Sequence, residues 1–192
     1  MRLHLIRHGH TNWDLIDEKG VKGMAASAAP LTQLGRLQIE TIANDYRLAD
    51  AEIILSSSYA RALESAAILS RVLNKPLVVE YDLHEWLPQT DSLQEVDEEL
   101  LLKASREFVK ETKEEVPWEK FSEVKKRVLS VLERYSRYDN IVVVTHAVVI
   151  SSLLGIKSSV DNAEIVSIDI DTDSFVDSNR SLQEHLLVST MW

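Results

Sequence analysis

The residues best suited to chemistry follow the first apolar run of the chain, where Leu3 to Ile6 leads directly into Arg7-His8-Gly9-His10-Thr11. A neutral imidazole is a nucleophile, and a guanidinium is a planar cation that fits phosphate oxygens. Glycine lets the backbone approach a ligand closely. Arg-His-Gly arises by chance in about one chain in a hundred of this composition. Alone, the tripeptide therefore fits a solvated strand end equally well.

A second cation follows the next apolar run, Ile53 to Leu55. In Ser56-Ser57-Ser58-Tyr59-Ala60-Arg61, the serines are suited to cap a helix and the alanine to open it, which puts Arg61 in the first helical turn. A cation there opposes the helix macrodipole. An anion between Arg61 and the helix end would explain this arrangement, although an exposed arginine in a first turn is also common.

A third candidate, His146, ends the apolar run Ile141 to Val144 in Thr145-His146-Ala147, again where a helix is expected to begin. A hydrogen-bonded structural histidine is the alternative for this residue alone. The three features gain weight together, because each one follows a run that reads as a strand buried on both faces, as in parallel sheets. Ligands of open α/β sheets bind at the carboxyl ends of the strands. Two arginines and two histidines meeting at that edge point to a phosphate.

Helical patterns separate these strands. The apolar spacing fits one helix through Ile39, Ile42, Ala43 and Tyr46, a second through Leu63, Ala66, Ala67 and Ser70, and a third from Phe121 to Tyr135. Together with Leu77 to Val79, the runs predict the order β-α-β-α-β-α-α-β-α and a mainly parallel sheet between helices. Later strands are expected at 164–170 and 186–190. Two long connections, 9–31 and 84–95, read as functional loops without regular structure.

Composition sets the class of protein. The 192 residues are 45% hydrophobic and 27% charged, which suits one globular domain spanning 1–192, and no repeat or linker divides them. The net charge of -10 argues against nucleic acid as a partner. No apolar run is long enough to span a membrane and no signal peptide is recognisable. The absence of cysteine excludes disulfides and thiolate metal sites and favours a cytoplasmic protein.

The combined motifs resemble the histidine phosphatase superfamily, the phosphoglycerate-mutase-like proteins. The resemblance covers residues 1 to about 155 in order, and its combination of motifs is highly specific. It is carried by Arg7-His8-Gly9-x-Thr11 with Trp13, Pro30-Leu31-Thr32-x-x-Gly35, Ser56-Ser57 followed by Arg61-Ala62, and Thr145-His146. It implies a three-layer α/β/α sandwich in which His8 becomes phosphorylated, while Arg7, Arg61 and His146 hold the transferring phosphoryl group.

The resemblance also implies an acid after the third strand that protonates the leaving oxygen. Glu85 is the preferred candidate, with Asp82 and Asp91 as alternatives. The expected substrate-binding set joins these to residues near the first two motifs: Arg7, Gly9, Thr11, Asn12, Gly23, Arg61 and His146. Asp14, where the family usually has Asn, is left out because a carboxylate would repel phosphate. Position 10 is His where Glu or Gln is frequent, position 147 is Ala where Gly is common, and the Gly-rich stretch after the acid is missing.

The other polar residues are less specific. His4 and His185 are expected to be structural, whereas His10 and His84, beside the motifs, fit either a substrate contact or none. Asp169, Asp171 and Asp173 have the spacing that begins a calcium loop, but Ser174 and Arg180 stand where glycine and glutamate are needed. No metal site and no cofactor are predicted, since two guanidinium groups and an imidazolium can neutralise the phosphate.

The predicted reaction is hydrolysis of a small phosphorylated metabolite through a phosphohistidine. The alternatives are a phosphoglycerate-mutase-type phosphotransferase, which the short chain disfavours, and a phosphate-binding module without catalysis, which the presence of Arg7, His8, Arg61 and His146 disfavours. Trp13, Trp86, Leu87 and the Ala-rich stretch 25–29 suggest a partly apolar pocket. The sequence identifies neither the substrate nor the oligomeric state.

Overall fold

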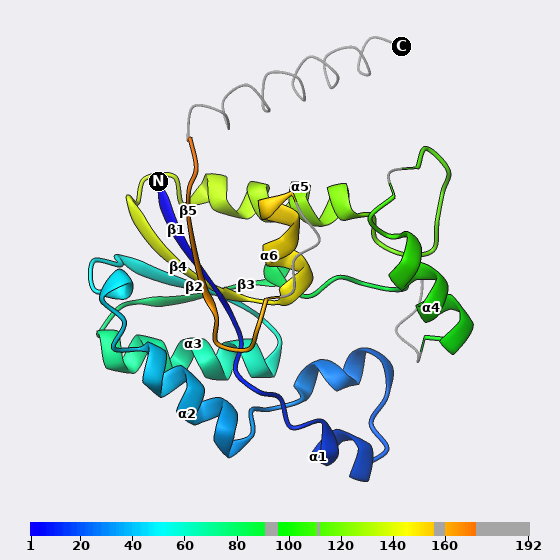
Figure 1. Ribbon diagram of the computed structural model, residues 1–192, viewed down its shortest axis with the longest axis horizontal. Helices are drawn as coiled ribbons and strands as arrows, with labels where there is room; N and C mark the ends of the chain where they lie inside the picture. Colours follow the sequence, from blue (N-terminus) through cyan, green and yellow to red (C-terminus); the bar gives the residue numbers. More distant parts are fainter. Residues whose placement is uncertain (91–95, 111, 156–159, 172–192) are drawn as a thin grey trace.

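The computed structural model describes residues 1–90, 96–110, 112–155 and 160–171, and contains a five-stranded sheet with helices on both faces (Figure 1). The strands are β1 (Arg2–Arg7), β2 (Ile53–Ser57), β3 (Leu77–Glu80), β4 (Asn140–Thr145) and β5 (Ile165–Asp169). The α-helices are α1 (Trp13–Glu18), α2 (Gln33–Ile42), α3 (Ala60–Leu73), α4 (Glu98–Glu107), α5 (Phe121–Arg134) and α6 (Ala147–Leu154). Short 3-10 helices are η1 (Gly23–Ala28), η2 (Tyr46–Leu48) and η3 (Tyr81–Leu83).

The strand order is β3-β2-β4-β1-β5, with β5 antiparallel to β1 and the other neighbours parallel. The expected α/β class with a mainly parallel sheet is thus confirmed. The register pairs Arg7 with Thr145 at the end of β1 and β4. The carboxyl ends of β1, β2 and β4 therefore meet at one edge of the sheet.

Alternate residues along the central strands build a core on each face. Ile141 and Val143 of β4 belong to the cluster beneath α5 and α6, whereas Val142 and Val144 belong to the cluster beneath α2 and α3. Figure 1 shows the same division, with α5 and α6 on one side of the sheet and α2 and α3 on the other. Both faces are buried, which is why these strands are continuous apolar runs in the sequence.

Two helical patterns were predicted correctly only in part. The helix through Ile39 ends at Ile42, and Tyr46 lies in η2 with 85% of its surface exposed. In α3 only Ala66 of the expected stripe is buried, whereas Leu63, Ala67 and Ser70 are not. The buried residues of this helix are Arg61, Ala62, Ser65, Ala66 and Leu69. Small and polar residues face the sheet here because α3 runs alongside the site, so hydrophobicity alone does not identify its inner face.

The connections also differ in part from the expectation. Segment 9–31 has regular structure, because it contains α1 and η1, each of six residues. The serines do not cap α3: its N-cap is Tyr59, with no side-chain cap hydrogen bond. Instead, the Ser57 hydroxyl accepts from the Tyr59 N–H at 3.2 Å, just before the helix. Several expectations fall on residues outside those described: the strand 186–190, the structural role of His185, Asp91 as the acid, and Asp173 in the calcium-loop pattern.

Candidate active site

His8 and His146 follow the carboxyl ends of β1 and β4, and both side chains are buried. Their ring centroids are 5.1 Å apart. Arg61, in the first turn of α3 after β2, is also buried, and its Nε donates to His8 Nε2 at 3.2 Å. The parallel register thus brings together three residues that are up to 138 positions apart in the chain.

The orientation of the His8 ring is set by its own loop. Nδ1 lies 2.8 Å from the Gly9 carbonyl oxygen. Because a carbonyl only accepts, Nδ1 carries the ring proton and Nε2 keeps its lone pair. Burial, followed by the charges of Arg61 and Arg7, lowers the pKa of His8 to about 3, although the Gly9 carbonyl acts in the opposite direction. His8 is therefore neutral at physiological pH, with Nε2 available as a nucleophile.

The backbone around His8 is held from two sides. On one side Gly9 N–H donates to the Ser65 hydroxyl at 3.1 Å. On the other side Asn162 Nδ2 donates to the His8 carbonyl at 3.0 Å, and the Ala163 N–H donates to the Arg7 carbonyl at 3.0 Å. Ala163 adopts φ +60°, a conformation that L-residues rarely adopt outside constrained turns. The turn before β5 therefore fixes the main chain that carries the imidazole.

Two buried polar atoms at this edge have no hydrogen-bond partner in the part of the chain that the structure describes: Arg7 Nε and His146 Nδ1. Arg7 is anchored elsewhere, since its Nη1 donates to the Val160 carbonyl at 2.6 Å. His146 Nε2 lies 2.8 Å from the Ser57 hydroxyl. Buried donors are normally satisfied in folded proteins. An anion bound between these residues would supply the missing acceptors.

Arg61 lies against two aromatic rings, with its guanidinium carbon 5.3 Å from the centroid of Trp13 and 5.0 Å from that of Tyr59. Within the described residues it makes no ion pair with a carboxylate. Burial lowers its pKa, but a guanidinium stays charged in proteins. The result is a buried cation held in place by ring faces and by His8.

The charge of His146 depends on its surroundings. Burial, helped by Arg61 and His8, holds its pKa well below the ordinary histidine value. The imidazolium expected from the sequence is therefore not the favoured form beside these cations. A bound anion would move the pKa back upward, because an opposite charge nearby favours the protonated ring.

Glu85 lies after η3, and its Oε1 accepts from the Trp86 N–H at 3.0 Å. Burial raises the pKa of this carboxyl, while the Trp86 N–H and then the charges of Arg61 and Arg7 act against the rise. Glu85 thus stays protonated to higher pH than an ordinary glutamate, as a general acid requires.

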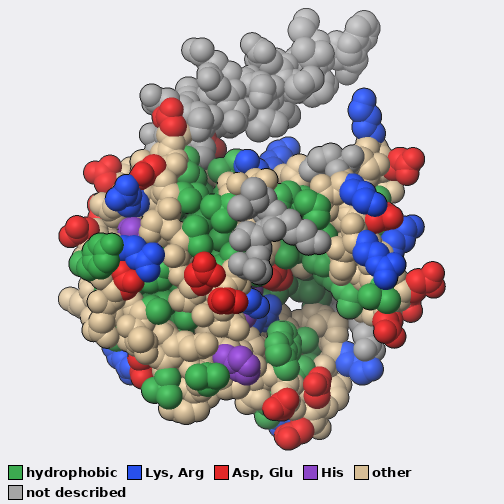
Figure 2. All heavy atoms as spheres, in the orientation of Figure 1, with side chains coloured by type: hydrophobic (Ala, Val, Ile, Leu, Met, Phe, Trp, Pro, Cys, Tyr) green, Lys and Arg blue, Asp and Glu red, His purple; other side chains and the backbone are tan. Residues whose placement is uncertain are grey.

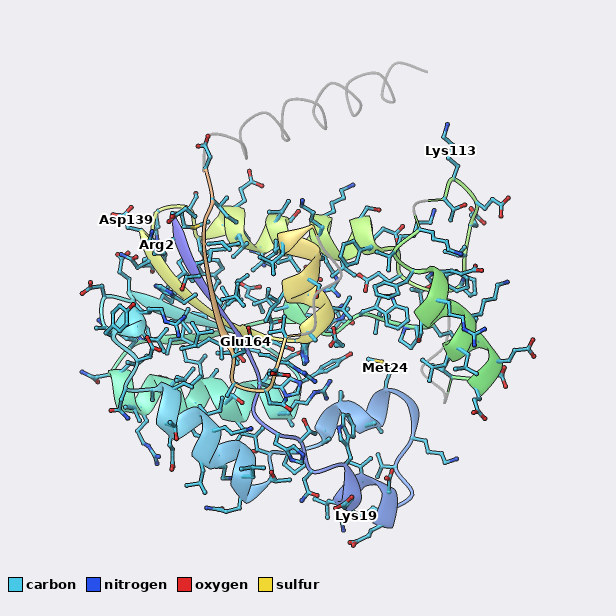
Figure 3. The ribbon with its side chains drawn as sticks, viewed as in Figure 1. Arg2, Lys19, Met24, Lys113, Asp139 and Glu164 are labelled. Carbon is cyan, nitrogen blue, oxygen red and sulfur yellow. The ribbon has the colours of Figure 1, made fainter. Side chains whose placement is uncertain are left out.

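A cavity of about 460 Å³ opens between the segment that holds α1 and η1, the loop after η3, and α4. Arg61 and Glu85 both contribute to its wall, as do Trp13, Met24 and Leu101. Figure 2 shows a hollow with a Lys or Arg side chain at its wall, and in Figure 3 the Met24 side chain points away from η1 into this space. The volume is in the range of small-molecule sites.

The remaining predicted binding residues occupy different positions. Gly9 and Thr11 lie in the buried loop, with Thr11 Oγ1 3.4 Å from His8 Nδ1. Gly23 lines the cavity. Asn12 is the N-cap of α1, where its side chain accepts from the Leu15 N–H at 3.1 Å.

The residues left open or set aside are accounted for as follows. Asp14 is exposed in the first turn of α1, where a carboxylate suits the helix end. His10 is exposed and hydrogen-bonded to Thr32, whereas His84 is buried, with Nδ1 2.7 Å from the Glu85 carbonyl. Asp82 lies in η3.

His4 and Asp169 are not among the residues that line the cavity. His4 lies in β1 and contacts the Ser167 hydroxyl through Nδ1 at 2.9 Å. Asp169 of the calcium-loop pattern pairs with Arg2 across β5 and β1, at 2.8 Å.

Sequence reasoning missed several residues that shape the site: Tyr59, Ser65, Glu119, Arg127 and Asn162. Tyr59 belongs to the segment Ser56 to Arg61, and its place two residues before Arg61 is the signal for their contact. Asp161-Asn162 is a turn signal that was not used. Glu119 and Arg127 carried no usable signal, because charged residues are frequent around α5.

A buried imidazole at the carboxyl edge of a parallel sheet, beside two arginines and a carboxyl with a raised pKa, is an arrangement suited to phosphate esters. This chain belongs to the histidine phosphatase superfamily (branch 1), whose family model matches residues 3–182. Among curated proteins it is similar to one from Hydrogenobacter thermophilus whose name provisionally assigns it as phosphoserine phosphatase 2. The two are 27% identical over 202 residues, which cover 97% of this chain and 93% of the relative.

Solved structures share the fold. YhfR of Bacillus stearothermophilus superposes with a TM-score of 0.69 and 20% identity, over 88% of this chain and 91% of that one. The mycobacterial glucosyl-3-phosphoglycerate phosphatase, in its complex with inorganic phosphate, gives a TM-score of 0.68 and 18% identity, over 88% and 89% of the two chains. The named relatives support a phosphatase, and the likeness to these structures supports the phosphoglycerate-mutase-like fold. Among the described residues, no helix combines the length and apolar character needed to cross a membrane.

Proposed function

We propose that this protein hydrolyses a small phosphomonoester through a phosphohistidine formed on His8. One observation carries the proposal: His8 is buried and neutral, its Nδ1 is committed to the Gly9 carbonyl, and its Nε2 meets Arg61 at 3.2 Å. A nucleophile and a phosphate-binding cation are thereby already oriented toward one point. The phosphatase names of the relatives support the same reaction class.

In the first step, the His8 Nε2 lone pair attacks phosphorus in line with the leaving oxygen. The P–N bond forms as the P–O bond breaks, and the leaving oxygen takes its proton from Glu85. Arg7 and Arg61 stabilise the charge on the equatorial oxygens, and His146 joins them once the phosphate has raised its pKa. The products are the free alcohol, phospho-His8 and the Glu85 carboxylate.

In the second step, a water molecule attacks the phosphoryl group of His8. Glu85 takes one proton from this water, the P–N bond breaks, and its electron pair returns to Nε2. Inorganic phosphate leaves, so that neutral His8 and protonated Glu85 are restored. The same carboxyl thus serves as acid and then as base, and its raised pKa favours the acid role.

We propose that the reaction needs no metal or cofactor. Arg7 and Arg61 are permanent cations at the point where charge develops, which is the role that magnesium plays in other phosphoryl transfers. Turnover should accordingly persist in EDTA. A loss in EDTA that magnesium or zinc restores would contradict this.

We further propose that the chain acts as a single domain in the cytoplasm on a small phosphorylated substrate. The family match over residues 3–182 supports one domain. The lack of cysteine supports a reducing compartment. The net charge of -10 argues against a nucleic-acid partner.

The experiment is to assay inorganic phosphate released from p-nitrophenyl phosphate and from alkyl phosphates by the wild type and His8→Ala. Stoichiometric phosphate and alcohol from the wild type, with none from the variant, are the expected result. Phosphoryl transfer to a second alcohol in preference to water would instead indicate a mutase. Retention of phosphate without turnover would indicate a binding module.

A further inference from the structure

The position of the leaving group in the cavity follows from the proposed mechanism. In-line attack places the leaving oxygen opposite His8 Nε2, and the acid that protonates it must touch it. Glu85 and Arg61 are both in the cavity wall. The alcohol that leaves must therefore extend from Glu85 into the cavity of about 460 Å³.

The wall beyond Glu85 is apolar. Among the described residues, η1, the loop after η3, and Val96 and Leu101 supply it. Its apolar members include Met24, Trp86, Leu87, Pro88, Val96 and Leu101. Such a wall stabilises a ligand by removing apolar surface from water, and a thioether beside aromatic rings adapts to ligand shape.

Few charged residues are found in the described part of this wall. Among the described residues that line the cavity, the charged ones are Arg61 and Glu85, and the mechanism assigns both to the phosphoryl group and the leaving oxygen. Ser27, Tyr59 and Gln89 add uncharged polar groups. A substrate ammonium or carboxylate would lose water against the described wall without gaining an ion-pair partner from it, which is costly.

We infer that the preferred substrates are phosphomonoesters whose alcohol has an uncharged, apolar body, aromatic or branched aliphatic. Phosphorylated amino acids and phosphoglycerates are disfavoured by the same wall. This inference rests on the proposed function and deepens it by naming the substrate class. It also separates this chain from what the names of its relatives suggest, because phosphoserine carries both an ammonium and a carboxylate.

The first test compares four primary phosphates: benzyl phosphate, ethyl phosphate, O-phosphoserine and 3-phosphoglycerate. We expect kcat/KM for benzyl phosphate to exceed that for ethyl phosphate by about 10- to 200-fold, the range for apolar groups in apolar pockets. Phosphoserine and 3-phosphoglycerate should fall below ethyl phosphate. A value for either charged substrate equal to that for benzyl phosphate would overturn the inference.

Two neighbouring leucines of α4 provide a matched pair of variants. Leu101 lines the cavity, whereas Leu102 is half exposed and is not among the lining residues. Leu101→Ala should raise KM for benzyl phosphate by about three- to tenfold more than KM for ethyl phosphate. Leu101→Arg should shift the ratio of kcat/KM values toward 3-phosphoglycerate by about tenfold or more, because it adds the missing cation. The same changes at Leu102 should do neither.

Failure of this inference differs from failure of the proposed function. If the protein hydrolyses phosphoserine best and both Leu101 variants behave as the Leu102 variants do, the substrate class is wrong and the phosphatase remains. If none of the four substrates nor p-nitrophenyl phosphate releases phosphate, the proposed function fails and this inference fails with it.

A second inference comes from an ion pair outside the cavity. Arg127 of α5 meets Glu119 through two contacts, Nε to Oε1 at 2.6 Å and Nη2 to Oε2 at 3.1 Å. The side chains are only 13% and 10% exposed. Such a bidentate, desolvated pair is geometrically rigid.

This ion pair is hydrogen-bonded to residues on both sides of Glu85. Arg127 Nη1 donates to the Asp82 carbonyl at 2.5 Å. Glu119 Oε2 accepts from the Leu87 N–H at 3.2 Å, and the Glu119 carbonyl accepts from Trp86 Nε1 at 2.7 Å. We propose that Arg127 and Glu119 are positioning residues that hold the Glu85 carboxyl where the leaving oxygen will be.

The test uses Arg127→Met, and the double variant Arg127→Met/Glu119→Gln, which leaves no unpaired buried charge if the single variant folds poorly. Arg134→Met is the control, because Arg134 lies two turns further along α5 and pairs with Glu80 at 2.5 Å. In these variants we expect kcat for benzyl phosphate to fall by at least tenfold more than the rate of the nitrophenol burst from p-nitrophenyl phosphate. The control should change neither. Equal losses for both substrates, or no loss, would overturn the positioning role.

Discussion

Arg61 Nε donates to His8 Nε2 across 3.2 Å, so the cation proposed to bind phosphate engages the very lone pair proposed to attack it. The contact keeps the imidazole neutral, because a donor at Nε2 is incompatible with a proton there. For transfer to begin, the phosphoryl oxygens must take over the Arg61 N–H group. Arg61 would thereby release the nucleophile as it binds the substrate.

Arg61→Ala should lower kcat/KM by about 10³- to 10⁵-fold, the range of arginines that stabilise phosphoryl transfer. Arg61→Lys should recover little, since a point charge cannot reproduce the planar fork. The free energy of unfolding, measured in urea, should change by no more than about 1 kcal/mol, because loss of ring contacts offsets relief of a buried cation. Arg71→Ala on the same helix, whose ion pair with Glu40 is exposed, should keep full activity. An active Arg61→Ala enzyme would assign Arg61 a structural role.

Gly9 and Gly35 pack so closely that a side chain at either position is expected to lower the stability of the fold. A Cβ at Gly35 would lie 2.3 Å from the His10 carbonyl oxygen, and one at Gly9 would lie 2.4 Å from that of Gly35. Both contacts are with backbone, so Gly35→Ala should destabilise the protein by about 1 to 3 kcal/mol and lower kcat. Gly20 has φ +61°, and a Cβ placed there would meet no atom within 4 Å. Gly20→Ala should therefore lower the free energy of unfolding by about 1 to 2 kcal/mol yet keep kcat/KM. Unchanged stability and activity in Gly35→Ala would refute the packing argument.

The sheet and the convergence of motifs were predictable because strands buried on both faces leave continuous apolar runs, and parallel strands bring their carboxyl ends together. The same pattern predicts the strand ends that carry Arg7, Arg61 and His146. Helix α1 was not predictable from periodicity, because six residues are too few for a repeat. Its signal is the cap residue Asn12, for which the motif instead suggests a substrate-binding role.

The inner face of α3 and the support of the Glu85 loop lie beyond pattern analysis for different reasons. In α3, buried Ser65 faces Gly9 to hold the motif loop, so polarity there reflects the site and not solvent. Arg127 and Glu119 contact η3 and the loop after it, 32 or more residues earlier in the chain. Only the three-dimensional arrangement brings them together.

Acid should destabilise the protein. Burial lowers the pKa of His8 to about 3, and the pKa values of His84 and His146 are also lowered by burial. Between the folded pKa and about 6.5, the unfolded chain binds more protons than the folded one, so stability falls as pH falls through this window. Glu85, with its raised pKa, acts in the opposite direction but is a single group.

The measurement is the free energy of unfolding in urea from pH 7 to pH 5. Each such histidine contributes a slope of at most about 1.4 kcal/mol per pH unit. His8→Asn should therefore show a smaller loss of stability than the wild type over this range. Identical slopes would mean that His8 titrates normally in the folded protein.

The proton-donor role of Glu85 depends on the leaving group. An alkyl alcohol leaves poorly as its anion, so Glu85→Gln should slow an alkyl phosphate by about 10²- to 10⁴-fold. Nitrophenolate is already stable, so transfer from p-nitrophenyl phosphate to His8 should slow far less, while hydrolysis of phospho-His8 still lacks its base. Rapid-mixing kinetics of Glu85→Gln should show a burst of nitrophenol followed by slow turnover. Asp82→Asn is the control; if it shows this signature and Glu85→Gln does not, Asp82 is the acid.

The phosphohistidine is the central claim, and rapid acid-free quenching of wild type with a ³²P-labelled phosphomonoester tests it most directly. The account predicts one label per chain at most, stable to base, lost in acid, located by peptide mapping at His8, and absent from His8→Ala together with turnover. Glu85→Gln should increase the labelled fraction, since its second step is slowed. A label that survives acid, a label at another residue, or His8→Ala turnover above a few per cent of wild type would contradict the account.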